Sequence, residues 1–588
     1  MELKYSQILK LNKELGNEMG SSSYSIIVLS NIIVHQVGEI LEFLLRGEGV
    51  RANVEFGDYD NIVQESSKSK HSNAVIIFWE LCNIIEGLQY KIELLDNNQL
   101  EDLIEKTKSE IDLALNNLER TSLVLLNTFT SLPFSHSNIR RNQLDKLAGH
   151  LNHYLEERIP SNVKLVYLDQ IIASVGVSNS LDMRYFYSSK ALYTVEFFKA
   201  YAGHVKPFII SSNGKAKKAL IFDCDNTLWK GVLGEDGLDN IEMSSTTKDG
   251  AIFAEIQSIA LALNSRGVLI GLCSKNNLGD VDEVITSHPH MQLRDEHITI
   301  NKSNWTDKVS NLREIAHELN VGLDSLVFID DSSFEVALVR EQLPEVTVLQ
   351  VPEKLHEYPT MLRINSNLFY NLSSSPEDQH KVKIYKQQAE REGDKKNYNS
   401  IEDYLKSLDL MVTVLTNDES ITSRMAQLSQ KTNQFNLTTK RYTESDIKKY
   451  IIDPNSDIFA FSVSDKFGSA GVAALSIITK DGKGSAAEID TLLMSCRVIG
   501  RNLEYAIIDY IIGKIKESKI DRVVAKYTRT HKNEHVKEFF DGCSFTLIDE
   551  DESAKKYTLE AKDYSPKNIS YINITDGITN GQRSRKND

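Results

Sequence analysis

The first third of the chain alternates short apolar runs with amphipathic stretches. Four of these runs predict buried strands, at residues 25–29, 74–78, 122–126 and 163–167. Between the second and third runs, helical spacing predicts one long amphipathic helix through Leu100, Leu103, Ile104, Ile111, Leu115 and Leu118. Strands that alternate with helices are typical of a parallel sheet covered by helices. We therefore expect residues 1–205 to form a parallel-sheet α/β domain.

In the middle of the chain, three further apolar runs end in residues suited to catalysis. The first run ends at Asp223, the second at Ser274 and the third at Asp330. A fourth polar group, Lys308, begins an amphipathic helix between the second and third runs. Active sites of open α/β sheets lie at the carboxyl ends of the strands. The pattern predicts that these four groups meet at one edge of a second sheet.

The residue types at that edge fit phosphoryl transfer. Asp223 and Asp225 are two carboxylates that can bind Mg²⁺ and leave one of them as a nucleophile toward phosphorus. Ser274 and Lys308 supply the hydroxyl and cationic donors that a transferring phosphoryl group needs. One of the two acids that follow the third run completes the metal site.

This set of motifs resembles the haloacid dehalogenase (HAD) superfamily, whose phosphotransferases form an aspartyl-phosphate intermediate. The resemblance implies that Asp223 is the nucleophile and that Asp225 is the general acid and base. It implies that Ser274 and Lys308 hold the phosphoryl group. It also implies a Mg²⁺ site built from Asp223, Asp225, Asp330 and Asp331. Within the last acidic pair, Asp330 is the expected ligand.

The spacing of the motifs leaves no room for a cap domain. Only 46 residues lie between Thr227 and Ser274, and only 33 lie between Ser274 and Lys308. The first gap must hold a flap at 231–239, a helix at about 248–265 and a strand. We expect an open site that suits bulky or protein-borne substrates, unless a neighbouring domain serves as the lid.

Three segments resemble one branch of the superfamily more narrowly. Trp229–Gly237, Cys273–Asn276 and Phe328–Asp331 look like the FkbH-like proteins. This resemblance is strong from residue 219 to about 352 and weaker over the rest of the chain. It implies an enzyme that transfers a glyceryl unit from 1,3-bisphosphoglycerate, a small acyl phosphate, to the phosphopantetheine thiol of an acyl carrier protein. Thr227 and Asn276 would then contact the substrate.

A cysteine stands next to the predicted phosphate-binding serine. Our hypothesis is that Cys273 transiently carries the acyl group, with nearby Mg²⁺ and Lys275 or Lys308 favouring the thiolate. The alternative is a small buried residue at a strand end, since free cysteine is commonly buried. Cys224 is a rival carrier, but its side chain should alternate away from Asp223.

Residues 400–565 predict a third unit, joined to the second by a polar linker at 372–399. Strands are expected at 410–415, 458–463, 471–477 and 488–495, before a helix at 503–515. The connection from Arg497 through Gly500 to Arg501 has the outline of a pyrophosphate cradle at a helix N-terminus.

This cradle resembles the acyl-CoA motif of GNAT acetyltransferases. The resemblance implies substrate contacts from Arg497, Gly500, Arg501 and Asn533. Asn502 departs from it, because the pattern has Gly or Ala there. The unit either binds the phosphopantetheine arm of a carrier protein or is an active, CoA-using acyltransferase. The amide-rich segment Gln430–Thr439 is expected to line a substrate site rather than a core.

The N-terminal unit could match the SGNH-hydrolase-like domain that FkbH-like chains often carry. Ser30 follows its first strand, but no Gly-x-Asn-Asp segment and no Asp-x-x-His pair accompany it. A serine after a strand is commonly a helix cap. We expect this domain to be catalytically silent and to serve as a docking surface for a carrier protein or a subunit.

Composition narrows the function classes. The length of 588 residues predicts three or four domains, and the net charge of −16 argues against nucleic acid as a partner. Five cysteines without paired spacing indicate neither a disulfide framework nor a zinc site. Without a signal peptide or a long apolar run, we expect a cytoplasmic protein with no membrane partner. The tail at 566–588 is predicted to be disordered.

Three functions remain open on the sequence. The first is an enzyme that turns an acyl phosphate into a carrier-bound thioester. The second is a Mg²⁺-dependent phosphatase of a sugar or protein phosphate, fused to a GNAT-type N-acetyltransferase. The third is a docking scaffold with decayed domains, which the intact acidic, hydroxyl and lysine set of the central domain argues against.

Overall fold

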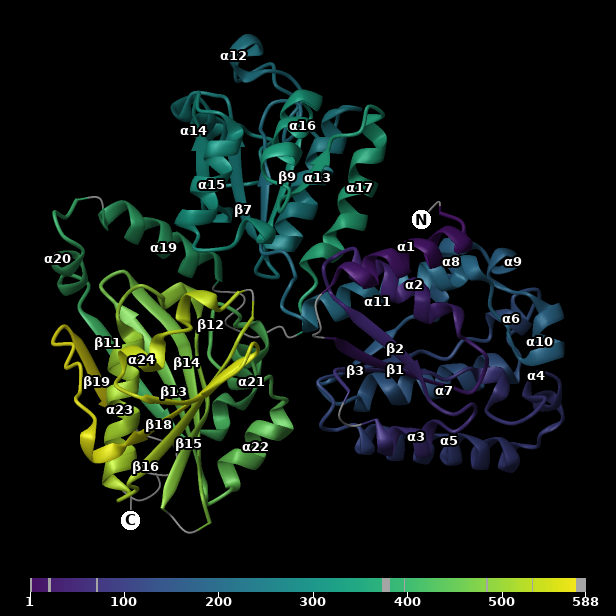
Figure 1. Cartoon of the computed structure of the whole chain (residues 1–588). Coiled ribbons are helices and arrows are strands. Elements are labelled where there is room, and N and C mark those ends of the chain that lie inside the picture. Colours follow the sequence, from purple (N-terminus) through teal and green to yellow (C-terminus); the bar gives the residue numbers. More distant parts are fainter. Residues whose placement is uncertain are drawn as a thin grey trace, which may run out of the picture. The chain divides into compact units, whose positions relative to one another are not determined.

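The chain contains three separate β-sheets with helices packed against them (Figure 1). The computed structural model describes residues 3–19, 23–69, 72–372, 381–395, 397–482, 485–530 and 532–577. Contacts divide the chain into one compact unit of residues 1–212 with 442–446 and a second unit of residues 213–441 with 447–588. The expected mixed α/β, multi-domain fold is confirmed. No helix among the described residues is both long and apolar enough to cross a bilayer.

The first unit is built on a five-stranded parallel sheet of order β2-β1-β3-β4-β5. Its strands are β1 (Tyr24–Ser30), β2 (Ala52–Phe56), β3 (Ala74–Phe78), β4 (Leu123–Asn127) and β5 (Val163–Val166). Its helices are α1 (Tyr5–Glu18), α2 (Gln36–Arg46), α3 (Ile62–Lys68), α4 (Leu88–Lys91), α5 (Asn97–Asn117), α6 (Leu132–Ser135), α7 (Gln143–Arg158), α8 (Leu168–Val175), α9 (Val177–Ser180), α10 (Met183–Ser189) and α11 (Val195–Ser212).

The four strands expected from apolar runs are present, and the sequence missed one. Every residue of β3 and β4 is buried, as both faces of a parallel sheet are covered by helices. The missed strand, β2, is an edge strand that pairs only with β1, and its Asn53 and Glu55 are exposed. An edge strand with polar outward positions has no continuous apolar run to reveal it.

The central sheet is also parallel, with the order β10-β9-β6-β7-β8. Its strands are β6 (Ala219–Phe222), β7 (Leu269–Ser274), β8 (Ile298–Ser303), β9 (Leu326–Asp330) and β10 (Thr347–Gln350). Its helices are α12 (Leu233–Asp236), α13 (Gly250–Asn264), α14 (Leu278–Ser287), α15 (Lys308–Glu318), α16 (Ser333–Gln342) and α17 (Tyr358–Asn365).

The two gaps between the central motifs hold only connecting elements. All residues from Thr227 to Lys308 are described. They form the short flap helix α12, then α13 and β7, and after Ser274 the elements α14 and β8. These gaps insert no cap domain, as their lengths predict.

The third sheet is mixed, with the order β17-β18-β16-β15-β14-β13-β11-β19, and β12 pairs with β15 off this path. Its strands are β11 (Leu410–Thr416), β12 (Phe435–Asn436), β13 (Ser456–Asp465), β14 (Gly468–Lys480), β15 (Ala486–Met494), β16 (Arg522–Thr528), β17 (Thr546–Glu550), β18 (Ala554–Glu560) and β19 (Ile572–Asp576). The helices of this part are α19 (Lys381–Lys395), α20 (Ile401–Lys406), α21 (Thr422–Lys431), α22 (Glu444–Ile452), α23 (Leu503–Glu517) and α24 (Phe539–Gly542).

The structure changes the expectation for the C-terminal end of this part. Disorder from residue 566 is wrong for 572–576, because β19 pairs in parallel with β11 and Ile572 is buried. Backbone pairing orders this segment even though its sequence is polar. Residues 578–588 lie outside the described residues, as does the whole polar stretch 373–380 of the expected linker. The rest of that linker includes α19.

Candidate functional site

Asp223 stands at the carboxyl end of the central strand β6. All four residues of β6 are buried between β9 and β7, and the backbone N–H of Asp223 donates to the Ile329 carbonyl at 2.9 Å. This bond extends the sheet by one residue and fixes the direction of the Asp223 carboxylate. The side chain is almost fully enclosed, with 6% of the residue exposed.

Lys308 joins this carboxylate to a second one. Its Nζ lies 3.1 Å from Asp223 Oδ1 and 2.5 Å from Asp330 Oδ2. Burial raises the pKa of Asp223, and the Lys308 ammonium opposes that shift. Burial lowers the pKa of Lys308, but the two carboxylates outweigh it and hold that pKa above its usual value. The lysine therefore remains a cation at neutral pH.

Three carboxylates at this edge can hold a divalent cation. Asp223, Asp330 and Asp331 each offer one oxygen, and these oxygens lie within 4.8 Å of one another. Burial and the neighbouring Asp330 raise the pKa of Asp331. Clustered carboxylate oxygens that carry uncompensated negative charge are the ligands that Mg²⁺ prefers. The donor set therefore fits the Mg²⁺ that the motifs imply.

Asp225, also expected at the metal, lies outside that carboxylate group. Its Oδ1 accepts from Trp229 Nε1 and from the backbone N–H of Leu233, each at 3.0 Å. Its Oδ2 accepts from Asn276 Nδ2 at 2.9 Å. The flap and the end of β7 thus orient a carboxylate that follows Asp223 by two residues. This geometry suits a general acid, and a metal contact from Asp225 stays a prediction.

The expected phosphate-binding side chains lie together. Ser274 is 2% exposed, and its hydroxyl accepts from Asn276 Nδ2 at 3.2 Å. It also lies near enough to the Asp223 carboxylate to oppose the rise of that carboxyl's pKa. The Thr227 hydroxyl is fully buried and has no hydrogen-bond partner among the described residues. A buried hydroxyl without a partner is costly unless a ligand or water satisfies it. Its place in the motif loop is consistent with the predicted substrate contact.

The two cysteines near the site are both enclosed. Cys273 is 0% exposed, and its Sγ points toward the Lys308 carbonyl oxygen at 3.9 Å, so the first turn of α15 covers it. Burial raises the pKa of this thiol, although the Lys308 charge opposes the shift. Cys224 is equally buried and packs in the apolar cluster on the opposite face of the sheet, as strand alternation predicts. Neither thiol has the accessible, thiolate-favouring setting of a reactive cysteine.

Two residues at this edge have roles that the sequence did not reveal. Lys275, expected to favour a thiolate at Cys273, instead forms an ion pair with Glu335 of α16 at 2.6 Å. Trp229 belongs to the flap segment that resembles the FkbH-like proteins, and only the structure shows that its indole N–H donates a hydrogen bond to Asp225. The sequence offered one clue to these roles, which is that both residues lie inside the motif segments.

Solved structures with a similar fold were found, while no family model and no curated protein match the chain. One structure is the N-terminal part of protein BF1531 from Bacteroides fragilis, which contains a phosphatase domain complexed with Mg. It is 24% identical, with a TM-score of 0.55, and the match covers 63% of this chain and 100% of that one. The likeness is one of fold.

Two acetyltransferase structures match the chain over a smaller part. The GNAT domain of PAT from S. lividans is 14% identical, with a TM-score of 0.21, over 25% of this chain and 89% of that one. Spermidine N-acetyltransferase from Vibrio cholerae, in complex with CoA and spermine, is 10% identical, with a TM-score of 0.21, over 26% of this chain and 96% of that one.

The predicted pyrophosphate cradle precedes α23, but its arginines are engaged internally. Arg501 is 6% exposed and pairs with the fully buried Asp465 at 3.0 Å, while also donating to the Arg497 carbonyl at 2.7 Å. Asn502 adopts a left-handed φ of 59°, and Gly500 has a φ of 82°. Substrate contacts of Arg497, Gly500 and Arg501 stay a prediction, and any anion bound here must compete with Asp465.

Part of the amide-rich segment lies in the core, contrary to expectation, and its place at a substrate site stays a prediction. β12 pairs with the last residues of β15, and Phe435 and Leu437 belong to the apolar core. The Leu437 carbonyl accepts from the Thr528 N–H of β16 at 2.7 Å, so the segment lies between two strands that separate. The fully buried Asn533 donates to the Asn436 carbonyl at 2.9 Å. Its amide therefore fastens this segment, and its predicted substrate contact remains untested.

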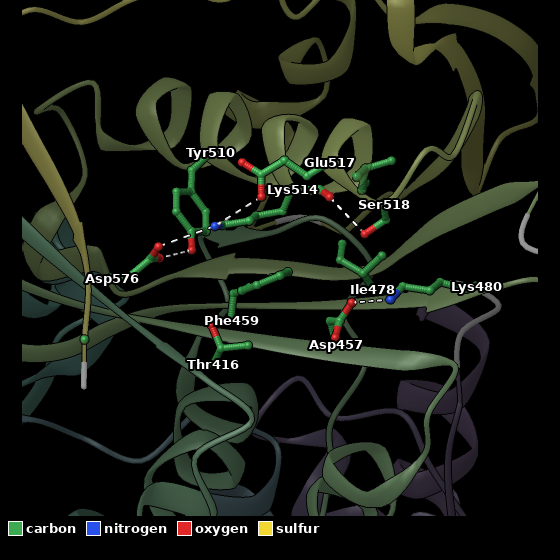
Figure 2. Close-up of a pocket in the computed structure, with 12 residues that line it drawn as sticks. Thr416, Asp457, Phe459, Ile478, Lys480, Tyr510, Lys514, Glu517, Ser518 and Asp576 are labelled. Atoms are coloured by element: carbon green, nitrogen blue, oxygen red, sulfur yellow. Dashed lines mark hydrogen bonds and ion pairs between the residues drawn. The ribbon is translucent and has the colours of Figure 1, made fainter. Parts of the chain in front are cut away.

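A cavity of about 500 Å³ opens at the other end of α23 (Figure 2). Its walls include Lys514, which lies 3.4 Å from Asp576 Oδ2, and Lys480, which lies 2.6 Å from Asp457. Tyr510 also donates to Asp576. The charged groups of the walls thus pair with one another, and none of the residues expected at the cradle lines this cavity.

The candidate catalytic residues of the N-terminal domain are engaged in local contacts. Ser30, the candidate nucleophile, donates to the Ile32 carbonyl at 2.9 Å within its own turn. Asp182, in the region where a catalytic acid and histidine were sought, binds the Arg184 guanidinium through both oxygens. These contacts agree with a catalytically silent domain.

Proposed function

We propose that the chain is a Mg²⁺-dependent enzyme of HAD type that processes an acyl phosphate and leaves the acyl group on a carrier-protein thiol. The observation that carries this proposal is the buried cluster of Asp223, Lys308 and Asp330, with Ser274 close enough to Asp223 to oppose the rise of its pKa. The most specific form of the proposal, implied by the FkbH-like resemblance, is glyceryl transfer from 1,3-bisphosphoglycerate to an acyl carrier protein.

In this proposal, Asp223 cleaves the phosphate ester of the substrate. The carboxylate attacks phosphorus, the bond from phosphorus to the ester oxygen breaks, and Asp225 gives a proton to the leaving alkoxide. Asp225 then takes a proton from the water that releases phosphate from Asp223. Lys308 and Ser274 hold the phosphoryl oxygens during both steps. Asp223, Asp330 and Asp331 would hold the Mg²⁺, which would supply positive charge that stabilises the transferring phosphoryl group.

The acyl group is proposed to pass directly to the carrier. The phosphopantetheine thiolate attacks the carbonyl carbon of the acyl phosphate, a carbon–sulfur bond forms, and inorganic phosphate leaves with the bonding electrons. Cys273 is left out of this step because its thiol is fully covered and burial raises its pKa. The open site suits a substrate that is carried on a protein.

A second candidate is a phosphatase of a sugar or protein phosphate, fused to a GNAT-type N-acetyltransferase. The burial of both nearby cysteines favours it, since simple phosphatase chemistry needs no thiol at the site. It predicts turnover of free phosphoesters without any carrier. The engagement of Arg501 by Asp465 gives no support to its acetyl-CoA step.

Intact-mass spectrometry separates the two candidates. The protein is mixed with Mg²⁺ and 1,3-bisphosphoglycerate, with and without a holo-carrier, and compared with the Asp223→Asn variant. We expect a glyceryl adduct on the carrier with the wild type, and a carrier adduct that retains its phosphate with the variant. Steady phosphate release from unrelated phosphoesters with no adduct would replace the first candidate with the second.

A further inference from the structure

The connections that leave the carboxyl ends of β3, β4 and β5 carry an unusual set of exposed side chains. These connections contain α4, α6 and α10, which Figure 1 shows at one end of the first unit. Tyr90 is 62% exposed, Tyr185 59% and Tyr187 72%, and the neighbouring Arg140 and Arg141 are exposed as well. We call Tyr90, Arg140, Arg141, Arg184, Tyr185 and Tyr187 the Tyr–Arg patch.

Packing beneath the surface joins the three connections. The ring of Phe134 in α6 lies 5.4 Å from that of the buried Phe186 in α10, measured between centroids. Phe186 in turn lies 5.4 Å from Tyr187. The connection that contains α4 is tied to the start of α7 by the Gln143 N–H, which donates to Glu93 at 2.8 Å. The exposed groups are therefore held on one supported surface.

The patch is locally basic in an acidic protein. The whole chain has 67 lysines and arginines against 83 acids, whereas residues 87–94, 131–145 and 181–190 have five against three. All three local acids are engaged: Glu93 accepts from Gln143, Asp182 from Arg184, and Asp145 from Ser131 and Ser135. Arg141 acts on Asp145 only at longer range, where its charge helps to lower the pKa of that carboxyl. In the described part of the chain, no carboxylate lies within 4.0 Å of the guanidinium of Arg140 or Arg141, so neither arginine has a direct ion pair.

Exposed tyrosine and arginine side chains are the types that protein interfaces favour. Both give large contact areas, and both are enriched among the residues that carry most of the binding free energy. An unpaired positive surface also accelerates encounter with an acidic partner. The solvated alternative, a set of independent surface side chains, does not explain why the surplus charge and the exposed rings occur together here.

We infer that the Tyr–Arg patch is the docking surface for an acidic protein partner. The inference rests on the proposed function in one respect, the identity of that partner as the carrier protein that supplies the thiol. The arginines contact its acidic side chains, and the exposed tyrosine rings pack against its apolar positions. Because the patch belongs to the domain that we expect to be catalytically silent, the proposed catalytic cluster and the partner site are carried by different domains.

The test uses the full-length protein and a purified, acidic acyl carrier protein in its holo form. Titration calorimetry compares the wild type with the double charge reversal R140E/R141E. A matched control reverses Arg120 and Arg158, two exposed arginines of the same domain that follow α5 and end α7, away from the patch. We expect Kd to rise at least about tenfold for R140E/R141E and less than about twofold for the control. A salt series should weaken only the wild type and the control.

A second variant guards against an effect of charge alone. Tyr187→Ala removes an exposed ring and leaves the charge unchanged, so it should also raise Kd about tenfold while circular dichroism stays the same. Equal affinity of wild type, R140E/R141E and Tyr187→Ala overturns the inference. Binding of single-stranded DNA at the patch in competition with the carrier also overturns it, in favour of a nucleic-acid site.

The failure of the proposed function can be told apart from the failure of the docking surface. If the carrier binds through the patch but never gains an acyl group, the proposed function fails and the docking surface stands. If the carrier gains the acyl group equally well with wild type and R140E/R141E at limiting carrier concentration, the docking surface fails and the proposed function stands. Phosphate release from a small phosphoester should be the same in all variants.

Discussion

Each of the two parallel sheets of this chain places polar side chains at its carboxyl edge, but these side chains make different kinds of contact in the two sheets. In the N-terminal sheet, Asn31 exchanges hydrogen bonds with the backbone of Glu80, and Asn127 exchanges them with that of Trp79. In the central sheet, carboxylates face one another around a lysine. Polar groups that satisfy the backbone close a sheet edge, whereas an excess of like charges leaves it ready for a ligand. Architecture alone therefore does not identify the active domain.

Substitution of Asp223, the proposed nucleophile, gives the largest expected effect in this comparison. Asp223→Asn should lower phosphate release by at least about 10³-fold, because an amide cannot attack phosphorus. The carboxylate also contacts Lys308, so a thermal melt should accompany the kinetic assay. Retained activity in a folded variant would remove Asp223 from its role and would erase the difference between the two sheets.

How far the sequence anticipated this site depends on the kind of residue. Asp223 and Ser274 were predictable, because buried strands deliver them to one edge of a parallel sheet, and Lys308 was predictable from the amphipathic helix that it begins. The engagement of Arg501 by Asp465 was not, since the two residues lie 36 positions apart and on different elements. The motif identified which groups are present but could not show which of them are already paired.

The same limit applies to the fold. Strands such as β3 and β4 were recognised by their unbroken apolar runs. By contrast, β2, β12 and β19 are short or polar, and they are strands because a neighbouring strand offers backbone hydrogen bonds. Pairing of this kind depends on tertiary context and leaves little trace in a single sequence.

Ser274 and Ser30 are each the last residue of a parallel strand, so they form a matched pair for comparison. Ser274 ends β7 beside Asp223, while Ser30 ends β1 and donates to its own turn. Ser274→Ala should lower kcat about 100-fold by removing a phosphoryl donor, and Ser30→Ala should change it less than about twofold. Steady-state phosphate release measures both. A large loss from Ser30→Ala would mean that the N-terminal edge is not silent.

The burial of Glu80 at the N-terminal edge should make the free energy of unfolding depend on pH. Glu80 is 1% exposed, Tyr193 donates to it at 2.7 Å, and burial raises its pKa to about 7. The unfolded chain has the ordinary pKa of 4.5. Between these two values the folded state keeps a proton that the unfolded chain has released, so stability falls as the pH rises toward 7. Above that pH the loss is complete and amounts to about 3 kcal/mol.

Glu80→Gln should remove this pH-dependent loss. Urea unfolding from pH 4.5 to 8.5 should show a smaller decline in the free energy of unfolding for the variant than for the wild type. The exposed Glu101→Gln on α5 is the control and should follow the wild type. Parallel profiles for all three proteins would mean that Glu80 is hydrated, and the N-terminal edge would then be more open than its hydrogen bonds indicate.

Cys273→Ala is the smallest expected effect and the sharpest test of how the acyl group moves. The thiol packs among apolar residues beneath the first turn of α15, so its loss should cost about 1 kcal/mol of stability by leaving a small cavity. Acyl transfer to the carrier should stay within about twofold of the wild type, with Cys224→Ala as the matched control. If Cys273→Ala instead stops acyl transfer but spares phosphate release, α15 must move to uncover the thiol. The central edge would then differ from the N-terminal one in mobility as well as in charge.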